Sequence, residues 1–201
     1  TVDPEVPEVI DMDGNVVVSY VPAGQFTLEN NASLIQTKPV TLNENLGDIK
    51  VKRESTTLNS NDYVYWSSPV DAGNMSMIHG TNAFQWNVNA PNSGVGLGNY
   101  VAVPGGVMEI ARGYIKRVNT PGDFISTFTG VPNNGLITQK VYLTGSGGPA
   151  GMAEADKHFN LIGNPYPSAL SAKKFYLGNS TAIEGAIYIW THGTSSSNAN
   201  V

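Results

Sequence analysis

The chain has 201 residues, a formal net charge of −5 and no cysteine. A chain without cysteine forms no disulfide, carries no thiolate nucleophile and offers no cysteine-based zinc or iron–sulfur site. Its apolar runs stay well below the ~18 residues of a membrane span, and its first residues lack the basic and apolar regions of a signal peptide. We therefore expect no membrane insertion, and the length suits one large all-β domain.

The composition indicates a turn-rich β protein. Charged residues make up 13% of the chain, against a usual fraction of about 25%, while there are 22 glycines and 12 prolines. The acidic excess lies at the N-terminus, in Asp3, Glu5, Glu8, Asp11 and Asp13; the other eleven of the sixteen acids equal the eleven Lys and Arg in number. The body is therefore neutral, and we expect no nucleic-acid partner, since phosphate binding needs clustered Lys and Arg.

The N-terminal part predicts short strands. Runs that favour β structure occupy residues 15–21, 25–28 and 33–36, with good turn formers between them. This close spacing is typical of solenoid rungs or hairpins. We expect three regions: an acidic N-terminal segment with capping strands at residues 1–44, a main β domain at 45–194, and a Ser/Asn-rich linker at 195–201.

The main domain reads as strands almost throughout. Residues 48–53 alternate in polarity, which places Ile49 and Val51 on a buried face and Lys50 and Lys52 in solvent. Further strands are predicted at residues 62–70, 84–88, 100–103, 108–110, 113–118, 123–129, 136–144 and 187–190. We expect an all-β fold with a β-sandwich or jelly-roll-like body.

Turns, loops and one helix complete the prediction. Asn-Gly at the end of residues 131–135 predicts a tight hairpin turn before the strand at 136–144. Asn/Gly-rich stretches at 71–99 and 144–157 predict long surface loops, where recognition usually resides. The single predicted helix covers residues 168–177, with Ser168 as its cap and Gly178 as its terminator.

Five separated motifs carry a resemblance to a known family. They are Tyr65-Trp66-Ser67-Ser68-Pro69-Val70, Gly113-Tyr114-Ile115, the run from Phe128 to Gly135, the run from Leu161 to Ala169, and Trp190-Thr191-His192. In this order, over about residues 25–194, they resemble a β-rich module of large secreted surface proteins of flavobacteria-like bacteria, which precedes a C-terminal sorting domain of the type IX secretion system. The stretch 24–35 is similar to the last rungs of a β-solenoid.

The resemblance implies an exported, secreted or cell-surface protein of many domains, often adhesin-like. It offers no catalytic residues to transfer, and the acidic start of this chain departs from the family pattern. It implies a non-catalytic structural or adhesive module whose partners are other domains of a larger surface protein, and a glycan or protein receptor. The alternative is a carbohydrate-binding accessory domain of a secreted polysaccharide-active enzyme.

The aromatic residues are the best candidates for ligand binding. Exposed aromatic faces can stack on sugar rings while their polar edges bind hydroxyls, and Trp66, Trp86, Tyr166 and Trp190 are the candidate platform. The competing interpretation is that these residues form the core. Alternation places Trp66 on the opposite face from Tyr63 and Tyr65, so at least one set is buried in a two-layer sheet.

Catalytic and metal sites have weaker support. The candidate carboxylates for a hydrolase are Glu109, Asp123, Glu154, Asp156 and Glu184, and the three histidines are His79, His158 and His192. Neither set has the spacing of a known motif, so we predict no enzyme and no required cofactor. Asp11 and Asp13 in Asp-Met-Asp-Gly are candidate calcium ligands, but an Asp-Gly turn is favoured because the rest of an EF-hand loop is missing.

Overall fold

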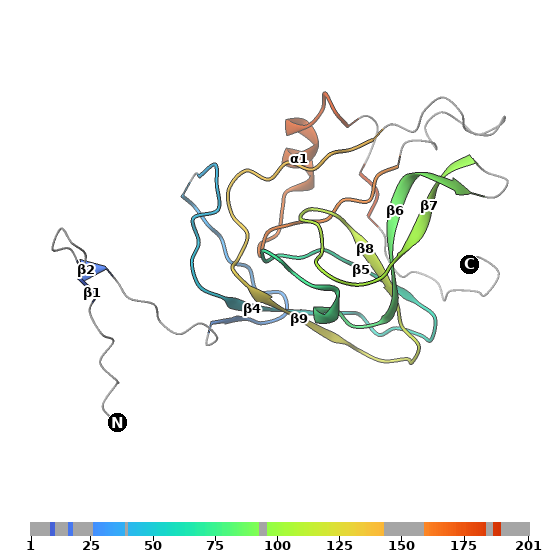
Figure 1. Cartoon of the computed structure of the whole chain (residues 1–201), viewed down its shortest axis with the longest axis horizontal. Helices are drawn as coiled ribbons and strands as arrows, with labels where there is room; N and C mark the ends of the chain where they lie inside the picture. The colour runs from blue at the N-terminus through green and yellow to red at the C-terminus, as the bar shows by residue number, and fades with distance from the viewer. Residues whose placement is uncertain are drawn as a thin grey trace.

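The computed structural model describes residues 9–10, 16–17, 26–38, 40–92, 96–142, 159–183 and 187–189. In these residues the fold is all-β with one short α-helix, as the sequence predicts (Figure 1). The elements are β1 (Val9–Ile10), β2 (Val16–Val17), β3 (Thr27–Leu28), β4 (Ile49–Glu54), β5 (Tyr63–Trp66), the 3₁₀ helix η1 (Met75–Met77), β6 (Thr81–Asn92), β7 (Gly96–Val103), β8 (Tyr114–Arg117), β9 (Ile125–Gly130) and α1 (Ala172–Gly178).

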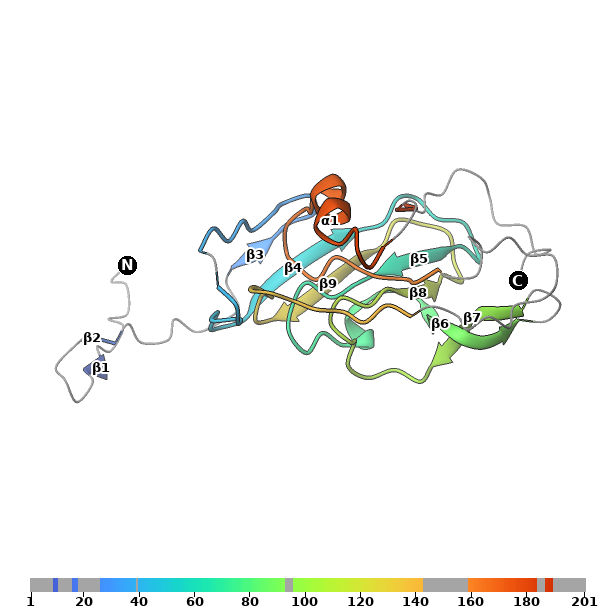
Figure 2. The same ribbon diagram turned by 90° about the horizontal axis from the view of Figure 1, so that it is seen from above.

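Two sheets form the body. One has the strand order β5-β8-β6-β7 and is antiparallel; the other has the order β3-β4-β9, in which β3 and β4 run parallel. Figure 2 shows the two groups of strands next to each other. A single hydrophobic cluster contains Val51 and Phe128 from the smaller sheet and Trp66 and Tyr114 from the larger one. The sheets therefore share one core, as in a sandwich.

Local alternation predicts the central strands correctly. In β4, Ile49 and Val51 are buried and the lysines between and after them are partly exposed. The strands predicted at 62–70, 84–88, 100–103, 113–118 and 123–129 correspond to β5 through β9. The stretch 71–99, expected as long loops, instead contains η1 and most of the β6–β7 hairpin, with a register shift between Asn87 and Pro91.

Other predicted strands are wrong. Residues 33–36, 108–110 and 136–142 are irregular, and the described residues 187–189 are irregular and exposed rather than a buried strand. Residue 143, Trp190 and the whole of the expected 144–157 loop lie outside the described residues. Residues 33–36 and 136–142 have β-favouring composition, but their described backbone bonds lead to irregular segments: the Leu34 N–H donates to the Pro167 carbonyl and the Leu136 N–H to the Thr41 carbonyl.

The helix begins later than predicted. Ser171, not Ser168, is the N-cap, and its hydroxyl accepts a bond from the Lys174 amide. Gly178 is the last helical residue rather than the terminator. Leu170 and Leu177 are exposed, so these apolar side chains do not pack the helix against the body. Short helices are normally stabilised by tertiary packing, yet this one buries none of its own residues.

The N-terminal strands differ in the strands with which they pair. β1 and β2 pair as an antiparallel hairpin. β3 pairs with β4 through Thr27–Lys50 and Leu28–Val51, and Leu28 belongs to the core cluster. Residues 26–44 thus contribute to the same core as the main domain, while the boundary between residues 44 and 45 stays a prediction.

A buried amide joins three separated segments. Asn133 is 1% exposed, and its side-chain Nδ2 donates to the Pro165 carbonyl at 2.8 Å and the Ser68 carbonyl at 3.4 Å. Its backbone N–H donates to the Pro69 carbonyl at 3.0 Å. We call residues 67–71, 131–135 and 163–167 around this side chain the Asn133 junction. The predicted Asn134-Gly135 hairpin does not form, because residues 136–142 after it are irregular rather than a paired strand, although Gly135 has the positive φ of 79° that such a turn uses.

Further contacts close the junction. The Ser67 hydroxyl donates to the Asn164 carbonyl at 2.8 Å, and the Tyr166 hydroxyl donates to the Gly135 carbonyl at 2.7 Å. Gly163 lies so close to Ser67 that a Cβ on the glycine would sit 2.2 Å from the Ser67 Cβ. Three of the five motifs quoted above therefore meet at one place.

Asn133→Asp tests the junction. A carboxylate there would face the carbonyl oxygens of Ser68 and Pro165 with no proton to donate, so we expect a loss of about 3 kcal/mol in the free energy of unfolding at pH 7. The matched control is Asn134→Asp next to it, which changes a partly exposed side chain and should cost no more than about 0.5 kcal/mol. Urea denaturation of both variants measures the difference, and equal stabilities would contradict the account.

Leu28→Ala tests whether β3 is integral to the fold. Removing a core side chain should destabilise the protein by about 2–4 kcal/mol. Leu42→Ala is the matched control, because the same substitution at an exposed position should change stability by less than about 0.5 kcal/mol. If thermal denaturation gave the two variants the same midpoint, residues 26–44 would be a dispensable extension.

Candidate functional site

The predicted aromatic platform is divided between core and surface. Trp66 is buried and packs against Phe128 across the sheets, with ring centroids 6.2 Å apart. Its indole N–H finds no acceptor among the described residues. Tyr166 is partly buried and serves the Asn133 junction through its hydroxyl. Trp86 lies partly exposed on β6, and Trp190 lies outside the described residues. Trp66 is therefore a core residue with no face to offer a ligand.

A different aromatic group surrounds Trp86. The Trp86 ring meets Tyr100 edge-on, with centroids 5.1 Å apart, and the Tyr100 and Tyr65 hydroxyls share a hydrogen bond of 3.1 Å. The Trp86 indole N–H donates to the Phe159 carbonyl at 2.7 Å, and the Phe159 ring meets Tyr188 edge-on at 5.5 Å. We call Tyr65, Trp86, Tyr100, Phe159 and Tyr188 the Trp86 surface.

Strand register builds this surface. Trp86 and Tyr100 are direct cross-strand partners in the β6–β7 hairpin, a position where aromatic pairs stabilise a sheet. Gly98 leaves room for the indole, since a Cβ there would lie 2.7 Å from Trp86 Cζ2, and its φ of +101° favours glycine. The indole therefore lies against the backbone of β7, and its position is fixed by the fold.

The Trp86 surface has the chemistry of a stacking platform. Tyr188 is 76% exposed and Phe159 is also exposed, so two rings face solvent beside a fixed indole. Burial, with a further contribution from the hydrogen bond to Tyr65, raises the pKa of Tyr100, so its hydroxyl stays neutral at physiological pH. Rings with polar edges of this kind can hold the apolar face of a sugar and bind its hydroxyls.

Sequence reasoning missed part of this surface. Trp86 is one of the four predicted platform residues, but Tyr65, Tyr100, Phe159 and Tyr188 are not among them. The Trp86–Tyr100 pairing follows from a register that a bulged hairpin sets, and Phe159 is brought in by a long-range bond from Trp86. In the sequence, only the alternation of residues 84–88 and 100–103 indicates the two strands that carry Trp86 and Tyr100.

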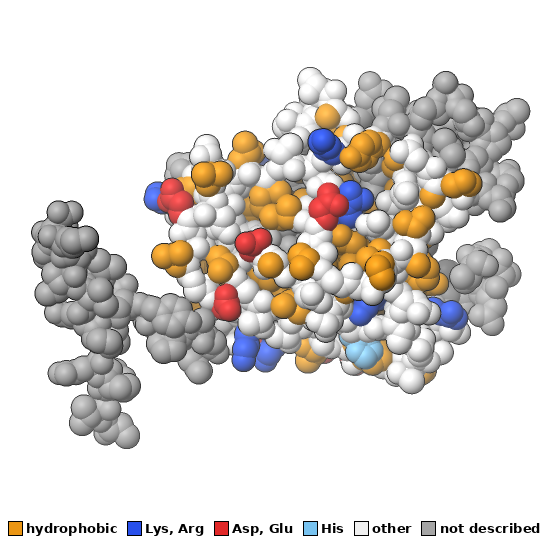
Figure 3. All heavy atoms as spheres, in the orientation of Figure 1, with side chains coloured by type: hydrophobic (Ala, Val, Ile, Leu, Met, Phe, Trp, Pro, Cys, Tyr) orange, Lys and Arg blue, Asp and Glu red, His pale blue; other side chains and the backbone are white. Residues whose placement is uncertain are grey.

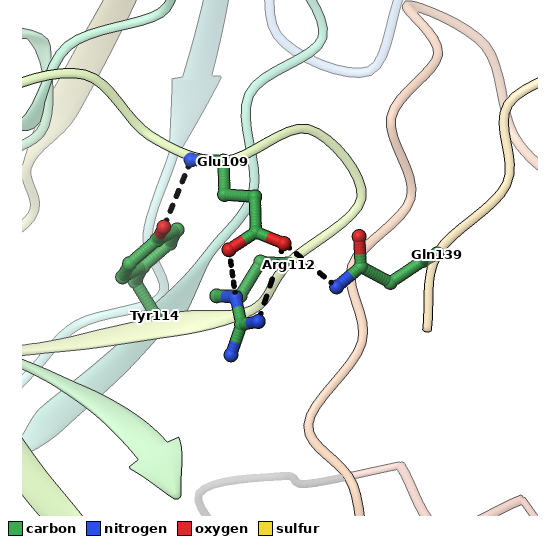
Figure 4. Close-up of polar contacts among 4 residues, drawn as sticks. All are labelled: Glu109, Arg112, Tyr114 and Gln139. Carbon is green, nitrogen blue, oxygen red and sulfur yellow. Dashed lines mark hydrogen bonds and ion pairs between the residues drawn. The ribbon is translucent and has the colours of Figure 1, made fainter. Parts of the chain in front are cut away.

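Glu109 has a structural ion pair (Figure 4). Its carboxylate accepts from Arg112 Nε at 2.7 Å and from Arg112 Nη2 at 3.2 Å, and Gln139 Nε2 donates to it at 3.1 Å. Its backbone N–H donates to the Tyr114 hydroxyl at 2.9 Å. The Arg112 hydrogen bonds hold the pKa of Glu109 below its usual value. An ionised, guanidinium-bound carboxylate is a poor general acid.

The remaining chemical candidates are not brought together in the described residues. Asp123 is exposed, and His79 stacks on Phe124 with centroids 3.8 Å apart. Glu154, Asp156, Glu184, His158 and His192, and the calcium candidates Asp11 and Asp13, all lie outside the described residues. Where side chains are described, no group of three or more His, Asp or Glu is placed to hold a metal ion. In the same residues no helix is long and apolar enough to cross a membrane.

Comparison with known proteins gives a family but no characterised relative. No curated protein and no solved structure matches the chain. One family model, described as "Domain of unknown function (DUF8693)", matches residues 8–201. Because this match covers nearly the whole chain, the protein belongs to the DUF8693 family.

Proposed function

We propose that the chain is a non-catalytic structural or adhesive module of an exported bacterial surface protein, and that it packs against a neighbouring domain of the same polypeptide. The five family-like motifs support export to the cell surface or medium through a type IX secretion pathway. Three of these motifs meet at the Asn133 junction and Tyr114 of a fourth lies in the core, which supports a structural role, because the side chains there hold segments together.

Exposed apolar side chains at one end of the sandwich carry this proposal. Leu46 is 95% exposed, and Ile35, Leu42 and Leu136 are each about three-quarters exposed. We call these four residues the end patch. Figure 3 shows several hydrophobic side chains at the end of the molecule where Figure 1 draws the chain before β4. The segments that carry them are neighbours, since the Leu136 N–H donates to the Thr41 carbonyl and the Asn45 amide donates to Gln36 Oε1, and exposed apolar residues gathered on one surface favour an interaction site.

The backbone beneath the end patch is fixed. The Leu136 amide donates to the Thr41 carbonyl at 3.2 Å, and the Asn43 and Asn45 side chains both donate to the Pro132 carbonyl. Gln36 donates to the Asn133 carbonyl at 2.8 Å. Segments on both sides of the patch are thus tied to the Asn133 junction. A surface held in this way loses little conformational entropy when a neighbouring domain covers it.

Single cysteines test the contact, because the native chain has none. Leu46→Cys should react readily with a maleimide in this chain and at least about tenfold more slowly in a longer polypeptide that includes the flanking domains, since a covered thiol is shielded from reagent. Val107→Cys, also at an exposed apolar position, is the control and should react at the same rate in both. Equal rates for Leu46→Cys in the two proteins would overturn the proposal.

A second candidate function is carbohydrate binding, as in an accessory domain of a secreted polysaccharide-active enzyme. The exposed Phe159 and Tyr188 rings beside Trp86 favour it. Its platform differs from the end patch, so the two proposals can fail separately.

Tyr188→Ala tests the sugar platform with least risk to folding. This side chain is exposed, and losing one stacking face should weaken glycan binding by about tenfold or less, in line with ~0.5–1.5 kcal/mol for aromatic contacts. Phe26→Ala removes another exposed ring, in the β3 region, and should leave binding unchanged. A glycan-array screen followed by titration calorimetry measures both, and an affinity for glycan that is unchanged in Tyr188→Ala would exclude this platform.

A further inference from the structure

A polar hollow lies on the opposite side of β6 and β8 from the Trp86 surface. It has a volume of about 490 Å³, and η1, β6, β8 and the loop after β8 contribute to its wall. Its polar lining consists of Ser76, His79, Thr81, Lys116, Asn119 and Thr120. We call it the Lys116 hollow. Its size is that of a small-molecule site, and several of its polar groups are exposed.

Lys116 gives the hollow a fixed positive charge. Its ammonium donates to the Met75 carbonyl at 2.9 Å and the Ile78 carbonyl at 3.0 Å, which ties η1 to β8. An ammonium has three donors, so one remains. The ion pairs among the described residues are Lys38–Glu44, Lys52–Glu29 and Arg112–Glu109. Lys116 is in none of them, although burial lowers its pKa.

Among the described residues, no carboxylate lines the hollow to balance this charge. A partly buried cation held only by carbonyl dipoles is a favourable partner for an incoming anion, because the pairing recovers electrostatic energy at reduced solvation. The single charge fits a ligand with one carboxylate. The hollow is many times larger than one carboxylate or phosphate requires, so the rest of the ligand must fill it.

The rest of the lining suits a hydroxylated ring. The Ser76 and Thr120 hydroxyls and the Asn119 amide are exposed and can exchange hydrogen bonds with sugar hydroxyls. Thr81 already donates to Asn119 Oδ1 at 3.1 Å, which orients that amide. The His79 ring, stacked on Phe124, and the exposed Ile125 side chain supply apolar area for a pyranose face.

We propose that the Lys116 hollow binds a carboxylated monosaccharide unit, a hexuronate, with its carboxylate on Lys116 and its ring beside His79 and Ile125. This inference goes beyond the proposed function. It uses a surface separate from both the end patch and the Trp86 surface, so it stands or fails without either.

The first experiment uses the whole chain and amide NMR spectra. Glucuronate and an oligogalacturonate should shift the amides of residues 76–81 and 116–120 in a saturable way, whereas glucose, which lacks only the carboxylate charge at C6, should not. Inorganic phosphate is the third probe. Shifts of equal size with glucose or phosphate would overturn the assignment, as would hexuronate shifts confined to the Trp86 surface or no saturable shift at all.

A pair of matched variants locates the charge. Thr120→Glu places a carboxylate at the exposed rim of the hollow and should weaken hexuronate binding by about tenfold or more through like-charge repulsion. Thr181→Glu makes the same change at an exposed turn after α1 and should leave the affinity within about twofold. Unchanged affinity in a folded Thr120→Glu variant would refute the site. Neither substitution touches Lys116, whose bonds to η1 also serve the fold.

Discussion

The structure depends on one buried amide. Asn133 satisfies carbonyls from two segments that are 65 and 32 residues away in the chain, and its backbone extends the pairing beside Pro69. Each of these groups would be a buried, unsatisfied polar atom without its partner, which is costly. The junction lies where β9 leaves the smaller sheet, so it joins that sheet to the segment that follows β5 in the larger one. The two sheets are thus held together by specific hydrogen bonds at the junction as well as by their apolar core.

The packing of segments at the Asn133 junction determines which surfaces of the sandwich stay exposed to solvent. The segment before β4 attaches to the junction through Gln36, Asn43 and Asn45, and that attachment holds the end patch out into solvent. On the larger sheet, one face supplies Trp66 and Tyr114 to the core while the other carries the Trp86 surface. Lys116 faces inward at the sheet margin, where η1 leaves a hollow. Three separate surfaces thus follow from one arrangement of strands.

Much of the fold could be predicted from local patterns, and the site could not. The alternation in β4 and the β-rich runs of β5 to β9 are patterns among residues close in sequence, so these strands could be predicted. The burial of Asn133 could not be predicted because it results from the packing of distant segments, whereas the neighbouring Asn134-Gly135 pair reports only a local turn propensity. Trp66 and Trp86 both lie on predicted strands, so the sequence does not distinguish them. Trp66 is buried because its side of the sheet faces the second sheet, whereas Trp86 lies on the other side and is partly exposed. Tyr100 belongs to the Trp86 surface because the register of β6 and β7 places it opposite Trp86.

Native-state hydrogen exchange is the most direct test of the central claim that the Asn133 junction closes the sandwich. The amides of Asp71, Asn133 and Gly163 donate to backbone carbonyls across the junction and its flank. If the junction belongs to the cooperative core, these amides should exchange with the same free energy of opening as the protected amides of β4 and β8. Exchange at a much lower free energy, while the sheets stay protected, would show that the junction opens independently and would contradict the account.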